Sequence, residues 1–148
     1  MRTADKILID TNVLVYVHQA LSPFHTRSKA LLEKGLREET SLCVCPQVLI
    51  EFYSVITNPK RVTNPVASDK AVLEIAKYFK SRKIAKIYPK EDTLKRTIEL
   101  IKNYPVTQMD VFDLQLVATM LSNGVKRLST FNVGDFEMFK EIEVTTPP

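Results

Sequence analysis

The fold is decided by the stretch Lys6-Ile7-Leu8-Ile9-Asp10-Thr11-Asn12-Val13-Leu14-Val15-Tyr16. Its three apolar residues at positions 7–9 favour a β-strand and predict one that is buried on both faces. Asp10 stands where this strand must end. In open parallel α/β sheets, ligands bind beyond the carboxyl ends of the strands, so residues 10–12 are candidates for a polar site. The alternative is that Asp10 or Thr11 only caps the helix that follows.

The composition is that of an ordinary globular domain. The chain has 148 residues, of which 45% are hydrophobic and 26% are charged, and we expect one domain over residues 1–148. No apolar run approaches the roughly 18 residues that span a bilayer, and the N-terminus lacks the apolar core of a signal peptide. We therefore expect no membrane segment and a cytoplasmic location.

The net charge of +4 indicates an anionic partner. A basic protein attracts polyanions in general, but carboxylates gathered at one place would repel a polyanion there. A divalent cation bound to those carboxylates would resolve the conflict.

The two cysteines, Cys43 and Cys45, lie two residues apart in a predicted strand. Their side chains should point to the same face, where they are poorly placed for a disulfide, so we expect reduced core residues. A zinc site is the alternative, and it would need His18 and His25 as partners. We interpret His25 instead as a surface or half-buried residue in the first turn of a helix.

Apolar runs, caps and breakers predict the remaining elements. Strands are expected at 41–45, 84–88, 126–131 and 142–145, and helices at 23–39, 46–56, 68–83, from 91 onward, at 109–121 and shortly before 140. Ser22, followed by proline, and Ser68 are the expected N-caps of two of these helices. The order β-α-α-β-α-α-β-α-α-β-α-β calls for an α/β fold with a mostly parallel central sheet of four to five strands and helices on both faces.

Two predicted helices carry apolar residues at the spacing of an amphipathic helix face. These residues are Val72, Ile75, Ala76 and Phe79 in one helix, and Leu94, Ile98 and Ile101 in the other.

Glu51 is the only charged residue in the eleven-residue run 46–56. If its face is buried, the carboxylate costs several kcal/mol unless a cation meets it. Alternatively, Glu51 lies on an exposed stripe with Gln47 and Ser54. The run alone does not decide between the two interpretations.

Further acids lie at helix starts and strand ends. Asp110 and Asp113 are three residues apart in the first turn of a predicted helix, where they share a face; an N-terminal capping arrangement would also explain them. Asn132 and Asp135 follow a predicted strand, as Asp10 does.

These acids together predict a metal site. Carboxylates brought close to one another destabilise each other unless a cation binds between them. Oxygen ligands without histidine or cysteine indicate Mg²⁺ or Mn²⁺, ions that serve phosphoryl-transfer chemistry.

The sequence also resembles a known family. Four motifs carry the resemblance, namely Ile9-Asp10-Thr11-Asn12-Val13-Leu14, Pro46-Gln47-Val48-Leu49-Ile50-Glu51-Phe52-Tyr53, Asp113-Leu114-Gln115-Leu116-Val117-Ala118 and Thr130-Phe131-Asn132-Val133-Gly134-Asp135-Phe136. Together they resemble a PIN domain and, more narrowly, the VapC-type ribonuclease toxins of toxin–antitoxin pairs.

The resemblance implies a set of site residues. The acidic ligands of the family fall on Asp10, Glu51 and Asp113. Its fourth acidic position is Asn132 here, and Asp135 three residues on could supply the missing charge or cap the last short helix. The polar supports that would orient ligands or water are Thr11, Asn12 and Thr130. Asp110 has no counterpart that the resemblance assigns.

The activity that the resemblance implies is endonucleolytic cleavage of RNA with Mg²⁺ or Mn²⁺, giving a 5′-phosphate and a 3′-hydroxyl. It further implies a homodimer and a cognate antitoxin that occupies the acidic groove. Two alternatives stand beside it. A haloacid-dehalogenase-like phosphatase would use Asp10 as nucleophile but needs a second aspartate where Asn12 stands. A non-catalytic PIN-like module that binds RNA or protein would have lost its metal site at Asn132.

Overall fold

The computed structural model describes residues 5–148, so the first four residues of the predicted domain lie outside the description. Within residues 5–148 the strands are β1 (Ile7–Ile9), β2 (Leu42–Val44), β3 (Ile84–Lys86), β4 (Arg127–Ser129) and β5 (Glu143–Thr145). The helices there are α1 (Thr11–Val17), α2 (His25–Leu36), α3 (Pro46–Ile56), α4 (Ser68–Lys80), α5 (Thr93–Asn103) and α6 (Asp110–Ser122), with a 3₁₀ turn, η2 (Val133–Asp135).

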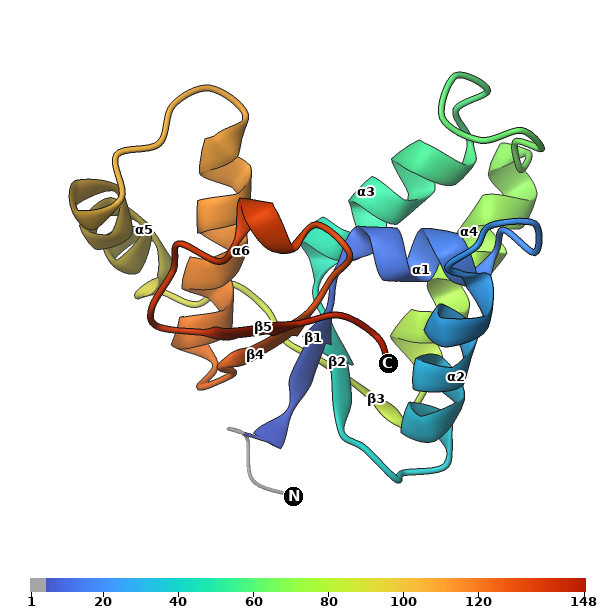
Figure 1. Cartoon of the computed structure of the whole chain (residues 1–148), viewed down its shortest axis with the longest axis horizontal. Coiled ribbons are helices and arrows are strands. Elements are labelled where there is room, and N and C mark those ends of the chain that lie inside the picture. Colours follow the sequence, from blue (N-terminus) through green and yellow to red (C-terminus); the bar gives the residue numbers. More distant parts are fainter. Residues whose placement is uncertain (1–4) are drawn as a thin grey trace.

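The five strands form one sheet in the order β3-β2-β1-β4-β5, and every pair is parallel. Figure 1 shows α1 to α4 on one side of this sheet and α5 with α6 on the other. The predicted α/β fold, with a parallel central sheet and helices on both faces, is confirmed. None of the described helices has the length and apolar character needed to cross a bilayer.

The central strands are buried on both faces, as their unbroken apolar sequence requires. Every residue of β1 and β2 is buried, and Leu8 pairs with Cys43 on one side and with Leu128 on the other. Cys43 and Cys45 are free and buried, as expected. Burial raises the pKa of the Cys43 thiol to about 12 and that of Cys45 to about 11, so both stay protonated at neutral pH.

Two predicted N-caps and one predicted helix are wrong. Helix α2 begins at His25, because the Ser22 hydroxyl accepts the Phe24 N–H at 3.1 Å in a turn before the helix. Ser68 is the first residue of α4 rather than its cap, and its hydroxyl accepts the hydroxyl of Tyr53 at 3.0 Å. The short helix expected before Lys140 is only the 3₁₀ turn η2.

The two amphipathic faces predicted for α4 and α5 are only partly buried. Ile75 in α4 and Ile101 in α5 pack against the core, whereas other residues of each face are exposed. In α4, Val72 is 53% and Phe79 58% exposed; Ala71 and Tyr78 are buried instead, with the Tyr78 ring 5.9 Å from that of Phe52. In α5, Leu94 and Ile98 are exposed, and the buried residues are Thr93, Thr97 and Leu100. The Thr93 hydroxyl lies 2.7 Å from that of Ser122 in α6, which explains how a polar face packs inward.

The sheet order creates one place where a site can form. The chain leaves β1 through α1 toward β2, whereas it leaves β4 toward β5 on the other side of β1. Adjacent parallel strands whose connections diverge in this way leave a crevice beyond their carboxyl ends. Asp10 follows β1 directly and Thr130 follows β4 directly, so both lie at this crevice.

Candidate active site

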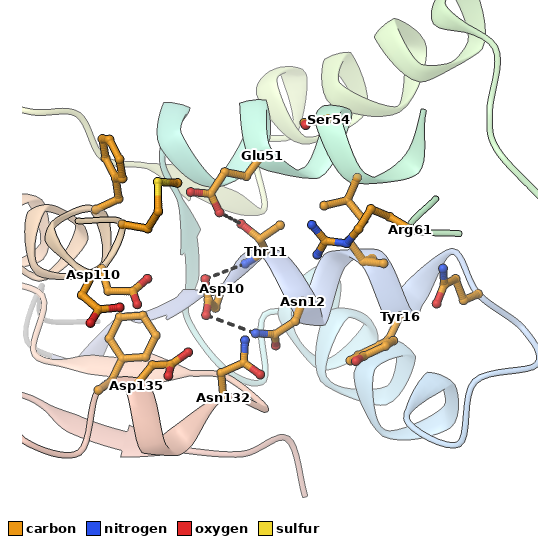
Figure 2. A pocket seen from close by; sticks show the side chains of 17 residues that line it. Asp10, Thr11, Asn12, Tyr16, Glu51, Ser54, Arg61, Asp110, Asn132 and Asp135 are labelled. Atoms are coloured by element: carbon orange, nitrogen blue, oxygen red, sulfur yellow. Dashed lines mark hydrogen bonds between the residues drawn. The ribbon is translucent and has the colours of Figure 1, made fainter. Parts of the chain in front are cut away.

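A pocket of about 680 Å³ opens beyond the carboxyl ends of β1 and β4 (Figure 2). The five carboxylates that line it are Asp10, Glu51, Asp110, Asp113 and Asp135, and the amide side chains of Asn12 and Asn132 line it as well. They come from the end of β1, from α1, α3 and α6, and from the segment after β4. The structure thus places the acids that the sequence singled out around a single pocket.

Asp10 is buried and accepts three hydrogen bonds. One carboxylate oxygen accepts the Thr11 N–H at 2.8 Å, and the other accepts the Thr130 hydroxyl at 2.8 Å and the Asn12 amide at 3.2 Å. Asp10 therefore caps α1 and lines the pocket at the same time. Burial raises the pKa of Asp10; the hydrogen bonds from Thr130 and Thr11 oppose the rise, and the charge of Glu51 adds to it.

Thr130 joins the ends of β1 and β4. While donating to Asp10, its hydroxyl accepts the side-chain amide of Asn12 and the N–H of Asn132, each at 3.0 Å. The amide oxygen of Asn12 in turn accepts the N–H of Phe131 at 3.0 Å. These bonds fix Asp10 relative to the segment that carries Asn132.

Glu51 is exposed on α3, so the interpretation of an isolated buried carboxylate is wrong. The alternative, that Glu51 lies on an exposed stripe of the helix, is correct. This stripe faces the pocket, since Glu51 and Ser54 both line the pocket. The Thr11 hydroxyl donates to the Glu51 carboxylate at 3.0 Å and thereby links α1 to α3. Gln47, one turn earlier, donates its amide to the carbonyl of Phe112 at 2.9 Å.

Asp110 and Asp113 lie in the first turn of α6, but the capping interpretation is wrong. Met109 occupies the N-cap position, and no side chain makes a capping hydrogen bond there. Asp113 is half-buried, and its pKa is raised to about 7, first by burial and then by the charges of Asp135, Asp10, Glu51 and Asp110, in decreasing order. Four other carboxylates are therefore close enough to Asp113 to repel its charge.

Asn132 and Asp135 are exposed and line the pocket beside η2. Asp135 is the last residue of that 3₁₀ turn, and no helix follows for it to cap. Both side chains can offer oxygen to the pocket, one as an amide and one as a carboxylate.

The chemistry of this donor set fits a hard divalent cation, because every candidate ligand is an oxygen and the carboxylates repel one another without a cation. The carboxylates are, however, widely spaced. Across residues 5–148, no three Asp, Glu, His or Cys side chains stand close enough to surround one ion.

The pocket also contains residues that the sequence did not single out. Arg61, from the segment between α3 and α4, lines it together with Tyr16 and Gln19 from the region of α1. No periodic pattern or motif marks Arg61, because its position follows from how the α3–α4 connection folds back toward α1. Only the structure places it at the site.

An acidic pocket beyond the carboxyl ends of two adjacent parallel strands defines a class of α/β proteins. Comparison with known sequences shows which family of that class this chain belongs to. The chain belongs to the PIN domain family, whose profile matches residues 7–142.

Individual relatives agree with this assignment. Ribonuclease VapC24 of Mycobacterium tuberculosis is 27% identical over 139 residues, which cover 94% of each chain. The crystal structure of M. tuberculosis VapC20, described as a Sarcin-Ricin loop cleaving toxin, superposes with a TM-score of 0.65 at 16% identity and covers 92% of this chain and 98% of that one. A toxin-antitoxin complex from Klebsiella pneumoniae gives 0.63 at 17% identity, covering 96% and 98% of the two chains. The two solved structures share the fold of this chain.

Proposed function

We propose that this chain is a metal-dependent endoribonuclease that hydrolyses RNA phosphodiester bonds, and that it acts in the cytoplasm as the toxin of a toxin–antitoxin pair. The observation that carries the proposal is the convergence of Asp10, Glu51, Asp113 and Asp135 on one pocket at the β1–β4 crevice. The family supports it, since divalent-metal dependence is typical of its ribonucleases, and so do relatives named as VapC ribonucleases.

Asp10, Glu51 and Asp113 would hold the ion, which we propose to be Mg²⁺ or Mn²⁺, with Asn132 or Asp135 as a fourth ligand. When bound, the ion supplies a water of lowered pKa and neutralises charge on the phosphate. The chain's own polar residues orient the ligands. Thr130 and Asn12 hold one oxygen of Asp10, and Thr11 holds Glu51.

The test is cleavage of total cellular RNA by the purified chain in Mn²⁺, with EDTA and the Asp10→Asn variant alongside. We expect discrete metal-dependent fragments that vanish in the variant, while circular dichroism shows that the variant keeps its fold. The substitution retains the size of the side chain and removes its charge. Full activity in Asp10→Asn would refute the assigned role.

A non-catalytic binding module is the second candidate, because Asn132 lacks the charge of the acidic position that the resemblance places there. The same RNA decides between the two functions. Retention of RNA without cleavage in Mn²⁺ by the unmutated chain would support the binding module and contradict the nuclease.

The fourth ligand is tested by comparing Asp135→Asn with Asn132→Ala. We propose that Asp135 supplies the charge, because both residues line the pocket and only Asp135 carries a carboxylate. Asp135→Asn should then lose more cleavage than Asn132→Ala. The opposite order would assign the fourth ligand to the amide oxygen of Asn132.

We also propose two protein partners, a cognate antitoxin and a second copy of the chain. The support for an antitoxin is that solved structures of the same fold are toxin–antitoxin complexes. For a homodimer, exposed apolar side chains such as Ile50, Leu94 and Met109 offer surface that a partner could cover. Light scattering after size exclusion gives the mass of the chain in solution, and a monomer at micromolar concentration would contradict the homodimer.

A further inference from the structure

The pocket has two chemically different ends. Figure 2 shows Asp110 and Asp135 at one end and Arg61 with Tyr16 at the other, with Asp10, Thr11 and Asn12 between them. Among the residues from 5 to 148 that line the pocket, Arg61 is the only one with a cationic side chain, and Gln19 lines it too. One end is thus built for cations, whereas the other offers a guanidinium, a phenol and an amide.

Arg61 is held on a well-anchored turn rather than on a loose loop. Its own N–H and that of Val62 both donate to the carbonyl of Asn58, at 2.9 and 3.1 Å. The Val62 side chain is buried, and the N–H of Val66 donates to the carbonyl of Ile56 at 2.8 Å. The backbone of Arg61 is therefore fixed against the end of α3, and its long side chain reaches the pocket from there.

Arg61 forms no ion pair with the acids of the described residues. The ion pairs found between residues 5 and 148 leave its guanidinium without a carboxylate within 4.0 Å. A guanidinium that faces a pocket without a protein partner is suited to an anionic group of a ligand, and its fork of donors matches a phosphate.

Tyr16 is held in place at the same end of the pocket as Arg61. Its ring lies 5.1 Å from that of Phe24 and 5.4 Å from that of Phe131, centroid to centroid, and the latter two rings are 4.6 Å apart. Tyr16 remains half-buried and lines the pocket. A ring supported in this way can stack with a nucleobase at little entropic cost, provided that the base is unstacked from its neighbours.

We propose that Arg61 and Tyr16, with Gln19, form a subsite for the nucleotide next to the cleaved bond. Arg61 binds the backbone phosphate of that nucleotide, and Tyr16 stacks with its base, so the substrate segment is single-stranded. This inference rests on the proposed nuclease function and names the form of RNA that its site accepts. Arg61 and Tyr16 position the substrate and take no part in the chemical step.

The chain offers a matched control for Arg61. Lys60 is the neighbouring cation on the same turn; it is exposed and does not line the pocket. Lys60→Gln and Arg61→Gln remove the same charge from the same loop. A difference between them therefore reports the contact in the pocket rather than the general attraction of a basic protein for RNA.

The experiment measures fluorescence anisotropy of a short fluorescein-labelled RNA in Mn²⁺, with every protein carrying Asp10→Asn so that the RNA is not cut. We expect Arg61→Gln and Tyr16→Leu each to weaken binding of the single strand on the order of tenfold, and Lys60→Gln to change it less than about twofold. The same RNA annealed to its complement should bind more weakly than the single strand. In the cleaving background, Arg61→Gln should raise KM and leave kcat nearly unchanged.

The outcomes separate this inference from the nuclease proposal. Equal binding by the Arg61→Gln and Lys60→Gln proteins, equal affinity for single and double strands, or no binding at all would each overturn the subsite. If Arg61→Gln weakens binding but the unmutated chain cleaves no RNA, the subsite stands as an RNA-binding site and the nuclease proposal fails. A fall in kcat at unchanged KM for Arg61→Gln would contradict the positioning role.

Discussion

At the scale of single residues, Asp10 shows how one side chain serves both the fold and the site. Capping and metal binding were alternatives in the sequence, yet the structure gives Asp10 the cap and a place in the pocket together. Its two carboxylate oxygens have different partners. One accepts the Thr11 N–H, and the other accepts the Thr130 hydroxyl and the Asn12 side-chain amide. An aspartate at a strand-to-helix turn therefore need not be assigned to only one role.

Asp113 should make the stability of the metal-free chain depend on pH. Its pKa is raised from 3.8 to about 7 in the folded state. Between those two values the folded chain holds a proton that the unfolded chain has released, so the free energy of unfolding falls as the pH rises. Below about pH 4 the carboxyl is protonated in both states and does not lower the free energy of unfolding. Above about pH 7 it is ionised in both states, and the loss of stability no longer changes with pH.

Asp113→Asn removes this cost, which is on the order of 1–3 kcal/mol once solvent screening is allowed for. In EDTA, the Tm of the variant should exceed that of the unmutated chain by a margin that grows between pH 4 and pH 7 and then levels off. Glu91→Gln, which changes an exposed carboxylate ahead of α5, is the control and should show no such margin. A margin that shrinks with rising pH would contradict the raised pKa.

At the scale of elements, the sequence predicted which segments form helices better than it predicted which face each helix buries. Helix α3 begins at Pro46 and ends at Ile56 as expected, because proline at the first helical position and the breaker after Thr57 are local signals. The buried faces of α4 and α5 depend on their neighbours. The spacing of Val72 and Leu94 fits an apolar helix face, but both residues are exposed. Helix α4 packs against α3, and α5 against α6, with the residues of a neighbouring face buried.

Two neighbouring aromatic residues, Tyr78 and Phe79, test which face of α4 is buried. Tyr78 is 6% exposed and packs against Phe52, whereas Phe79 is 58% exposed. Tyr78→Ala should therefore lower the free energy of unfolding by about 3–5 kcal/mol, and Phe79→Ala by less than about 1 kcal/mol. Urea denaturation of the two variants gives both values, and the reverse order would place α4 with its other face inward.

Gly35 allows α2 to lie close against β2. A Cβ atom at this position would stand 2.8 Å from Cγ of Leu42 and nearer still to its Cδ1, and Leu42 is buried with little room to move. Gly35→Ala should lower the free energy of unfolding by about 1–3 kcal/mol through overpacking, although alanine favours a helix by up to about 1 kcal/mol.

Thermal unfolding of two glycine variants tests this contact. At Gly134 an added Cβ meets nothing within 4 Å, so Gly134→Ala is the control and should leave Tm nearly unchanged. A Gly35→Ala variant as stable as the unmutated chain would mean that Leu42 can rearrange.

At the scale of the whole molecule, the order of elements and the candidate acids could be predicted, but the geometry of the site could not. Short buried strands followed by acids at their ends are local features, which Ile7–Ile9 and Asp10 display plainly. The exposure of Glu51 and the place of Arg61 depend on how α3 and its following turn pack against α1. No local pattern encodes such a packing arrangement.

Metal binding should stabilise the whole domain. The unfolded chain has no clustered carboxylates, so an ion that binds the folded chain alone raises the free energy of unfolding, by about 2.7 kcal/mol at a concentration of 100 Kd. Millimolar Mn²⁺ or Mg²⁺ should raise Tm in the unmutated chain and much less in Asp10→Asn. Calorimetric scans with and without EDTA measure the shift, and equal shifts in both proteins would place the ion elsewhere.

The pocket draws its acids from residues as far apart as Asp10 and Asp135, and the latter follows the fourth of five strands. A ribosome that has released only the first hundred residues has therefore delivered two of the four proposed ligand carboxylates and no β4 to set beside β1. The pocket, and any activity that depends on it, can therefore form only after the β4 segment has been synthesised.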